Sequence, residues 1–130
     1  MFFEFADAEV ARLEWEAGVM SLRFSAAALT SYSGGEVQWA PVLMRAVPSQ
    51  KGVLEVQTLL KSGAWAGRLR EGVWLPEGAG RQRVLRLPWT SAAVGTLELE
   101  WAHGLRIELP LQSLALQLPD DAQPVQAWQC

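Results

Sequence analysis

The feature that most restricts how this chain can fold is an alternation of apolar and polar residues over positions 96–109. Leu97, Leu99 and Trp101 point to one face of an extended strand, and the residues between them point to the other. The alternation resumes in phase after positions 102–104, as expected for a three-residue hairpin loop that ends in a left-handed glycine. The sequence therefore predicts an antiparallel hairpin that is buried on one face.

The phase of the alternation also predicts the register of this hairpin. Trp101 is expected to pair with Leu105, and Glu100 to face Arg106 across the two strands. An exposed ion pair of this kind contributes less than about 1 kcal/mol, so it serves the register more than the stability.

A second hairpin of the same kind is predicted near the N-terminus. Its loop at residues 16–19 places Trp15 opposite Met20 and Leu13 opposite Leu22. The two hairpins share a Leu-Glu-Trp sequence before the loop. Either an internal duplication or the same physical constraints acting twice would produce this likeness.

Turn-forming residues divide the rest of the chain into short apolar segments. A strand is expected at residues 36–47, where Pro41 indicates an edge position or a bulge. Residues 48–52 are predicted to form a turn, and residues 88–95 a connection. Further strands are expected at residues 53–60, 82–87 and 113–118.

The stretch 56–69 fits two interpretations. Val56 and Leu59 belong to an apolar stripe with helical spacing, whereas Gly63 and Gly67 disfavour a helix. The apolar residues that follow suit short strands, so the strand interpretation is preferred.

Together these segments predict an all-β fold of about eight to ten short strands with little helix. An antiparallel β-sandwich and a partly closed β-barrel both satisfy this pattern. A length of 130 residues suits one domain. We assign a single β domain to residues 1–121 and a loose C-terminal tail to residues 122–130, unless Val125 and Trp128 pack on the body or on a neighbour.

Composition excludes several classes of protein. No apolar run approaches the ~20 residues of a membrane span, and no basic region precedes a long apolar segment at the N-terminus, so we expect a soluble, cytoplasmic protein. The net charge of −3 is spread along the chain, which disfavours nucleic acid as a partner. The only cysteine is Cys130, so no intramolecular disulfide is possible.

No combination of residues indicates catalysis or metal binding. His103, the only histidine, lies in a predicted hairpin loop, and one histidine with one terminal cysteine cannot form a recognisable zinc site. Carboxylate pairs such as Glu98 with Glu100 lie on the wet face of a strand, where they remain ionised. The glycine-rich segments lack the lysine and helix of a phosphate-binding loop. We therefore expect no enzyme activity, no metal and no cofactor.

The unusual compositional feature is seven tryptophans, against one tyrosine and four phenylalanines. One account has Trp15 and Trp101 filling the core, with most of the others beside them. The other account places some indoles on a surface, where they form an interface, a ring-stacking platform or the wall of an apolar pocket. The candidates for such a binding role are Trp39, Trp65, Trp74 and Trp128.

Elimination ranks the function classes. The first is a non-enzymatic interaction or accessory module, or a homo-oligomer, that uses a β edge and exposed tryptophan or leucine as contacts. A composition that favours arginine over lysine and is rich in alanine and leucine is typical of a bacterial protein. The alternative is a binder of a sugar or an apolar small molecule, through a tryptophan-lined surface or cleft. An enzyme would require a glutamate in an apolar cleft.

Overall fold

A computed structural model describes residues 1–31 and 33–120 of the chain. Within them, six antiparallel strands close into a barrel in the spatial order β1-β2-β3-β8-β7-β4, which returns to β1. The strands of this barrel are β1 (Phe2–Glu16), β2 (Val19–Thr30), β3 (Gln38–Pro48), β4 (Gly67–Pro76), β7 (Gly95–Trp101) and β8 (Arg106–Gln117). The all-β prediction is confirmed, and of its two forms the barrel is the one observed.

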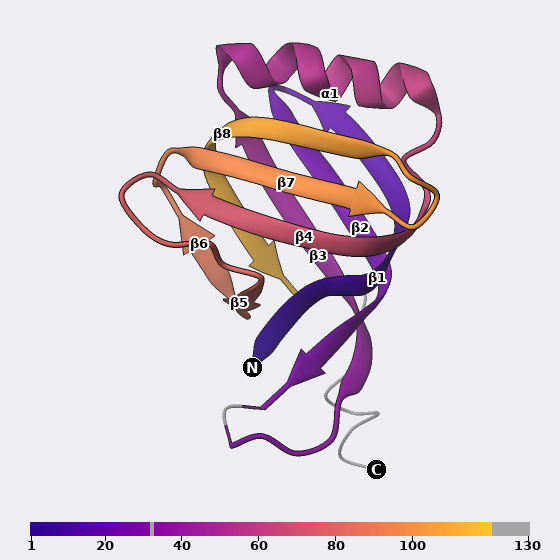
Figure 1. Ribbon diagram of the computed structural model, residues 1–130, viewed down its shortest axis with the longest axis vertical. Helices are drawn as coiled ribbons and strands as arrows, with labels where there is room; N and C mark the ends of the chain where they lie inside the picture. Colours follow the sequence, from indigo (N-terminus) through magenta and orange to yellow (C-terminus); the bar gives the residue numbers. More distant parts are fainter. Residues whose placement is uncertain (32, 121–130) are drawn as a thin grey trace.

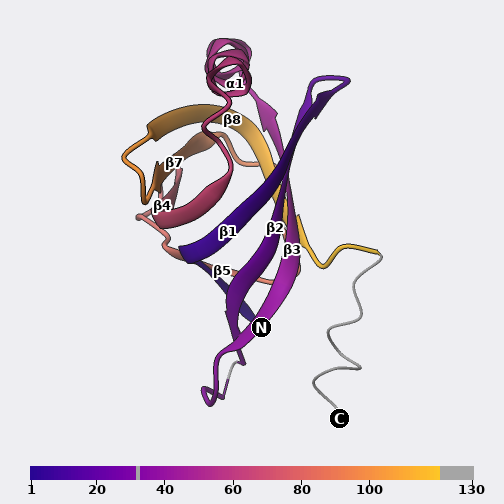
Figure 2. The same ribbon diagram turned by 90° about the vertical axis from the view of Figure 1, so that its right-hand side faces the viewer.

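Two short strands and one helix complete the fold. β5 (Val84–Arg86) pairs with the start of β1, and β6 (Trp89–Ser91) pairs with the end of β8. The helix α1 (Gln50–Ser62) crosses one end of the barrel, above β8, β7 and β4 (Figure 1). The view turned by 90° places β4 and β7 on one side of the barrel and β1, β2 and β3 on the other (Figure 2).

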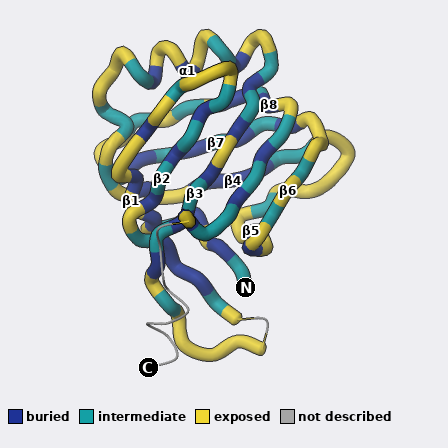
Figure 3. Tube along the Cα trace, turned by 180° about the vertical axis from the view of Figure 1, so that it is seen from behind, coloured by how far each residue is buried: buried dark blue, intermediate teal, exposed yellow. Residues whose placement is uncertain are grey.

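Alternation along the strands builds the core. Along β2, β3 and β8, buried residues mostly alternate with residues of intermediate burial or exposed residues (Figure 3), as expected for strands with one face in a barrel interior. The largest fully buried side chains include Trp74, Trp101 and three phenylalanines. The Phe3 ring packs edge-on against the Phe5 ring, with the ring centroids 5.0 Å apart.

Both predicted hairpin registers are confirmed. In the first, Trp15 pairs with Met20 and Leu13 with Leu22. The turn between β1 and β2 consists of Ala17 and Gly18, with φ angles of 52° and 77°. Two successive positive φ values are what a two-residue turn needs to match the twist of its strands.

In the second hairpin, the loop between β7 and β8 ends at Gly104, whose φ is 105°. The Trp101 N–H donates to the Leu105 carbonyl at 2.8 Å, and the Gly104 N–H donates to the Trp101 carbonyl at 3.0 Å. This is the three-residue loop with a glycine bulge that the sequence predicts. Arg106 Nε lies 3.3 Å from Glu100 Oε1, which confirms the expected ion pair.

Pro41 lies at both an edge and a bulge. The pairing of β2 with β3 shifts register between Phe24 and Ala27, opposite the residues on either side of Pro41. On the other side of β3, pairing with β8 begins only at Leu43. The proline, which has no N–H to donate, thus stands where the ladder is interrupted.

The preferred strand interpretation of residues 53–60, with a turn before it, is wrong, because residues 50–62 form α1. Ser49 caps the first turn by accepting the N–H of Gly52 at 3.4 Å, and Gly63 ends the helix with a φ of 66°. The glycine that disfavoured a helix is therefore its C-terminal cap. Val56 and Leu59 form the buried face, as the alternative interpretation required.

The expected last strand at residues 113–118 is the second half of one long strand, β8. Pro110 does not interrupt it. It stands opposite Thr96 in the ladder with β7. Because pairs that exchange backbone hydrogen bonds alternate with pairs that do not, starting from Trp101 and Leu105, this pair is one that does not. Its carbonyl accepts the Ser49 N–H at 2.9 Å, on the side of α1. The expected connection at residues 88–95 contains β6.

Candidate protein-interaction surfaces

The structure separates the tryptophans proposed for binding. Trp39 is 54% exposed on β3, whereas Trp65 is partly buried against the core. Trp74 is 0% exposed, so the expectation that it lies on a surface is corrected: it points into the barrel because it shares the inward phase of β4 with Gly72. Trp128 lies outside the described residues.

Trp39 belongs to a row of residues that crosses four strands on one outer face. Val84 of β5 pairs with Glu4 of β1, Glu4 with Ala28 of β2, and Ala28 with Trp39 of β3. Residues that are directly opposite in a sheet point to the same side, so these four side chains form one surface. We call it the tryptophan face. Val84 is 46% exposed, so both ends of the row present apolar side chains to solvent.

A second surface lies on the opposite wall of the barrel, beneath α1. It is a groove of about 700 Å³ across the outer side of β4, β7 and β8, and we call it the acidic groove. Lys51 and Glu55 of α1 line it on one side. The remaining charged residues of its lining are Glu71, Glu98, Glu100, Arg106 and Glu108.

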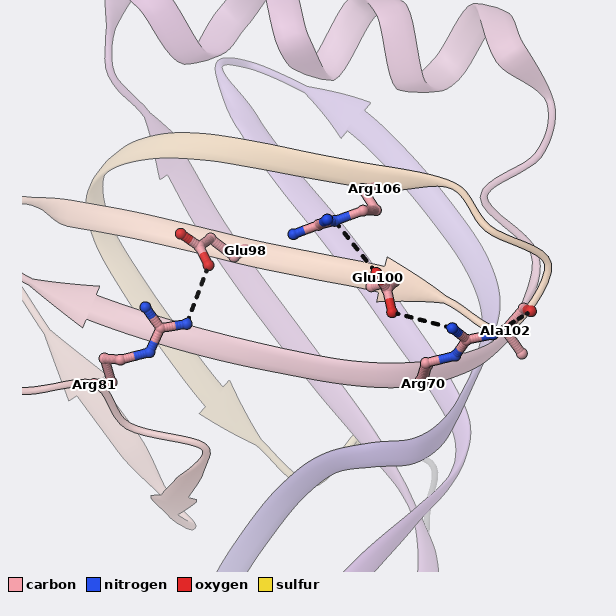
Figure 4. A network of polar contacts seen from close by, with 6 residues as sticks. All are labelled: Arg70, Arg81, Glu98, Glu100, Ala102 and Arg106. Carbon is pink, nitrogen blue, oxygen red and sulfur yellow. Dashed lines mark hydrogen bonds and ion pairs between the residues drawn. The ribbon is translucent and has the colours of Figure 1, made fainter.

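Arginines neutralise two of these glutamates (Figure 4). Glu100 lies between Arg106, at 3.3 Å, and Arg70, whose Nη1 is 3.6 Å from the carboxylate. Arg70 also donates to the carbonyl of Ala102 at 3.3 Å. Arg81 reaches Glu98 at 3.5 Å from the loop that follows β4. The three arginine side chains are 57–72% exposed, so each pair contributes little to stability.

A third surface is an apolar hollow of about 470 Å³, lined by Met1, Leu87, Pro88 and Leu118. The Leu87 N–H donates to the Met1 carbonyl at 2.8 Å, which joins the chain start to the connection between β5 and β6. The side chains of these four described residues are all apolar, so they offer apolar contact to a ligand.

No family model, curated protein or solved structure matches this chain. The surfaces must therefore be judged on their own chemistry. Among residues 1–31 and 33–120, no three His, Cys, Asp or Glu side chains are grouped so that they could hold a metal ion. In the same part of the chain, no helix is long and apolar enough to cross a membrane.

His103 contacts a neighbouring aromatic ring and a backbone carbonyl. Its ring stacks on Trp101, with centroids 6.5 Å apart and planes 21° apart, and its Nε2 lies 2.8 Å from the carbonyl oxygen of Ala64. Trp101 Nε1 donates to the next carbonyl, that of Trp65, at 2.8 Å. The two rings therefore hold the segment between α1 and β4 against the β7–β8 loop.

Sequence reasoning missed the acidic groove as a unit. It placed Glu98 and Glu100 on an outward strand face, and both line the groove. Glu55 comes from α1, which the sequence analysis expected to be a strand. Glu71 comes from a stretch that was expected to form short strands, but the pairing of this strand with β7 was not predicted. The only available signal was the outward phase of charged residues on the β7–β8 hairpin, which says nothing about the neighbouring strand.

Proposed function

We propose that this protein is a non-enzymatic protein-interaction module whose contact surface is the tryptophan face. The observation that carries the proposal is the 54% exposure of Trp39 on a strand segment that, within residues 1–31 and 33–120, pairs with another strand on one side only. Tryptophan is enriched among the residues that dominate binding energy at protein interfaces. The partner is another protein of the cytoplasm or a second copy of this chain.

The strand edge at Trp39 supports this proposal. Residues 38–42 of β3 extend past the point where β8 begins to pair, so within the described residues their second edge has no neighbouring strand. An unpaired edge offers backbone hydrogen bonds to an added strand. Val37, which is 47% exposed, extends the apolar surface toward the preceding loop.

Site-specific photo-crosslinking tests the proposal. A photoreactive phenylalanine analogue replaces Trp39 in one variant and Leu54 in the control, because Leu54 is an equally apolar residue that is 66% exposed on α1. We expect discrete crosslinked products at position 39 and none at position 54 when the variants are irradiated in cell extract. A product of twice the chain mass identifies a homodimer.

Two results would contradict this function. One is a position 39 variant that yields no discrete product. The other is the same set of products from both positions, because crosslinking would then not depend on which surface carries the photoreactive residue.

The apolar hollow favours a second candidate function, the binding of a small apolar molecule. Its volume of about 470 Å³ lies within the range of small-molecule sites, about 300–1,000 Å³. Native mass spectrometry of freshly purified protein separates the two candidates. A monomer with a discrete additional mass supports ligand binding, and an oligomer without one supports protein interaction.

A further inference from the structure

We infer that residues 121–130, which lie outside the described residues, pack on the outer side of β3 and cover Trp39 of the same chain. Trp39 also carries the proposed function, but this docking needs no partner protein, so the two can be tested separately. The inference rests on the place where the described chain ends, on the side chains beside that place and on the residues that the segment brings to it.

The first step is the position at which the segment begins. Gln117, the last residue of β8, pairs with Leu43 of β3. The two strands are antiparallel, so the chain leaves β8 toward the lower-numbered end of β3. Residues 38–42 lie at that end, and among residues 1–31 and 33–120 they have a neighbouring strand only in β2. The segment therefore starts beside the part of β3 that holds Trp39.

The second step is the direction in which the chain leaves the ladder. Two further pairs in the same register would set Pro119 opposite Pro41, and neither residue has an N–H to donate. The ladder cannot continue there, so the chain turns out of the sheet. After β8 it lies on the side of β3 that faces away from β4 and β7 (Figure 2). This is the outer side of the barrel wall.

The third step is the apolar surface at this place. Every second side chain of β3 points outward, since the residues between them are buried. Trp39 is the exposed member of this row, and Pro41 and Leu43 beside it are only partly buried. Removing such apolar area from water is favourable. The segment brings two large apolar side chains for this contact, Val125 and Trp128.

The fourth step is charge. Arg45 lies on the outer side of β3 next to Leu43, is exposed, and forms no ion pair with any residue that the structure describes. Arg23 of β2 pairs with Leu43, so a second cation borders the same surface. The chain carries two adjacent carboxylates, Asp120 and Asp121, at the point where the segment begins. Opposite charges therefore favour the chain's own segment as the occupant.

The fifth step is reach. Eight residues lead from Asp120 to Trp128, and an extended chain of that length spans up to ~28 Å. Trp39 lies four positions along β3 from Leu43, a distance of ~13 Å. The segment is therefore long enough to turn at Pro124, a residue that favours turns, and to place Trp128 on Trp39.

Disulfide trapping tests this inference, because Cys130 is the only cysteine of the chain. One variant is Ser25→Cys. Ser25 is exposed on β2, within the register shift that lies opposite Pro41. The matched control is Thr90→Cys. Thr90 is equally polar and exposed, and it pairs with Ala115 on the other side of β8.

A segment without a docking site would reach both positions, since both lie within two strands of β8. With oxidised glutathione, we expect an intramolecular disulfide to form at position 25 about tenfold faster than at position 90, because docking raises the effective concentration of Cys130 there. Mass spectrometry of the unreduced monomer measures both rates. Trp128→Ser should abolish the difference, whereas the neighbouring substitution Gln129→Ser should preserve it.

Equal rates at positions 25 and 90 would overturn the inference, as would a preference for position 25 that survives Trp128→Ser. A main product of twice the chain mass would also overturn it, because the segment would then dock on a second copy. The purified protein contains no partner, so a negative result here leaves the photo-crosslinking test of the proposed function unaffected.

Discussion

The ring of Phe5 lies directly on the backbone of Gly72. A Cβ atom at position 72 would come within 2.7–2.8 Å of three atoms of the Phe5 side chain. These two residues belong to β1 and β4, whose ladder consists of only the pairs Glu9–Arg68 and Val10–Gly67. The barrel is therefore closed at this seam largely by side-chain packing, and the absence of a side chain at position 72 permits it.

Gly72→Ala should lower the free energy of unfolding by about 1–3 kcal/mol, because the added methyl group displaces a core phenylalanine. Gly80→Ala is the control: no atom lies within 4 Å of its Cβ position, and its φ is not positive. Urea denaturation of both variants measures the difference. Equal stability of the two variants would refute the close contact at the seam.

Trp101→Ala should lower the free energy of unfolding by about 3–5 kcal/mol, since Trp101 is fully buried. The variant also loses the donor to the Trp65 carbonyl. Glu100→Ala, at the adjacent position, should cost less than about 1 kcal/mol because both arginine partners of Glu100 are exposed to solvent. Thermal unfolding compares them, and similar small losses would refute the inward phase of Trp101.

Ser49→Ala should destabilise the protein by about 0.5–2 kcal/mol through loss of the α1 N-cap. Thr58→Ala provides a comparison, since Thr58 is an exposed residue of the helix interior. Its substitution should change stability by less than about 0.5 kcal/mol. If circular dichroism during chemical denaturation shows the same midpoint for both variants, Ser49 does not cap the helix.

Glu108→Gln should stabilise the protein by roughly 0.2–1 kcal/mol, because it removes the repulsion from Glu98 across the ladder. The gain should shrink in ~1 M salt, which screens exposed charges. Glu14→Gln, whose carboxylate faces Ser21 and lies 3.5 Å from Arg12, should bring no gain. Destabilisation by Glu108→Gln would show that this carboxylate has a favourable role in the fold.

Sequence by itself determined the two hairpins, the interruption of the strand ladder at Pro41 and the inward position of Trp101. These features depend on local rules: side chains alternate with a period of two, a short turn selects glycine, and proline cannot donate to a ladder. Each rule acts over a few residues, so these features can be predicted without knowledge of the rest of the chain.

Tertiary structure decided the state of residues 50–62, the burial of Trp74 and the composition of the acidic groove. Gly52 is compatible with α1 because it lets the helix lie against Pro110, where a Cβ atom would collide with the carbonyl oxygen. Glu71 meets Glu100, and Val84 shares a face with Trp39, only because strands far apart in sequence pair when the barrel closes. Long-range pairing of this kind depends on how the whole core packs, which no local pattern encodes.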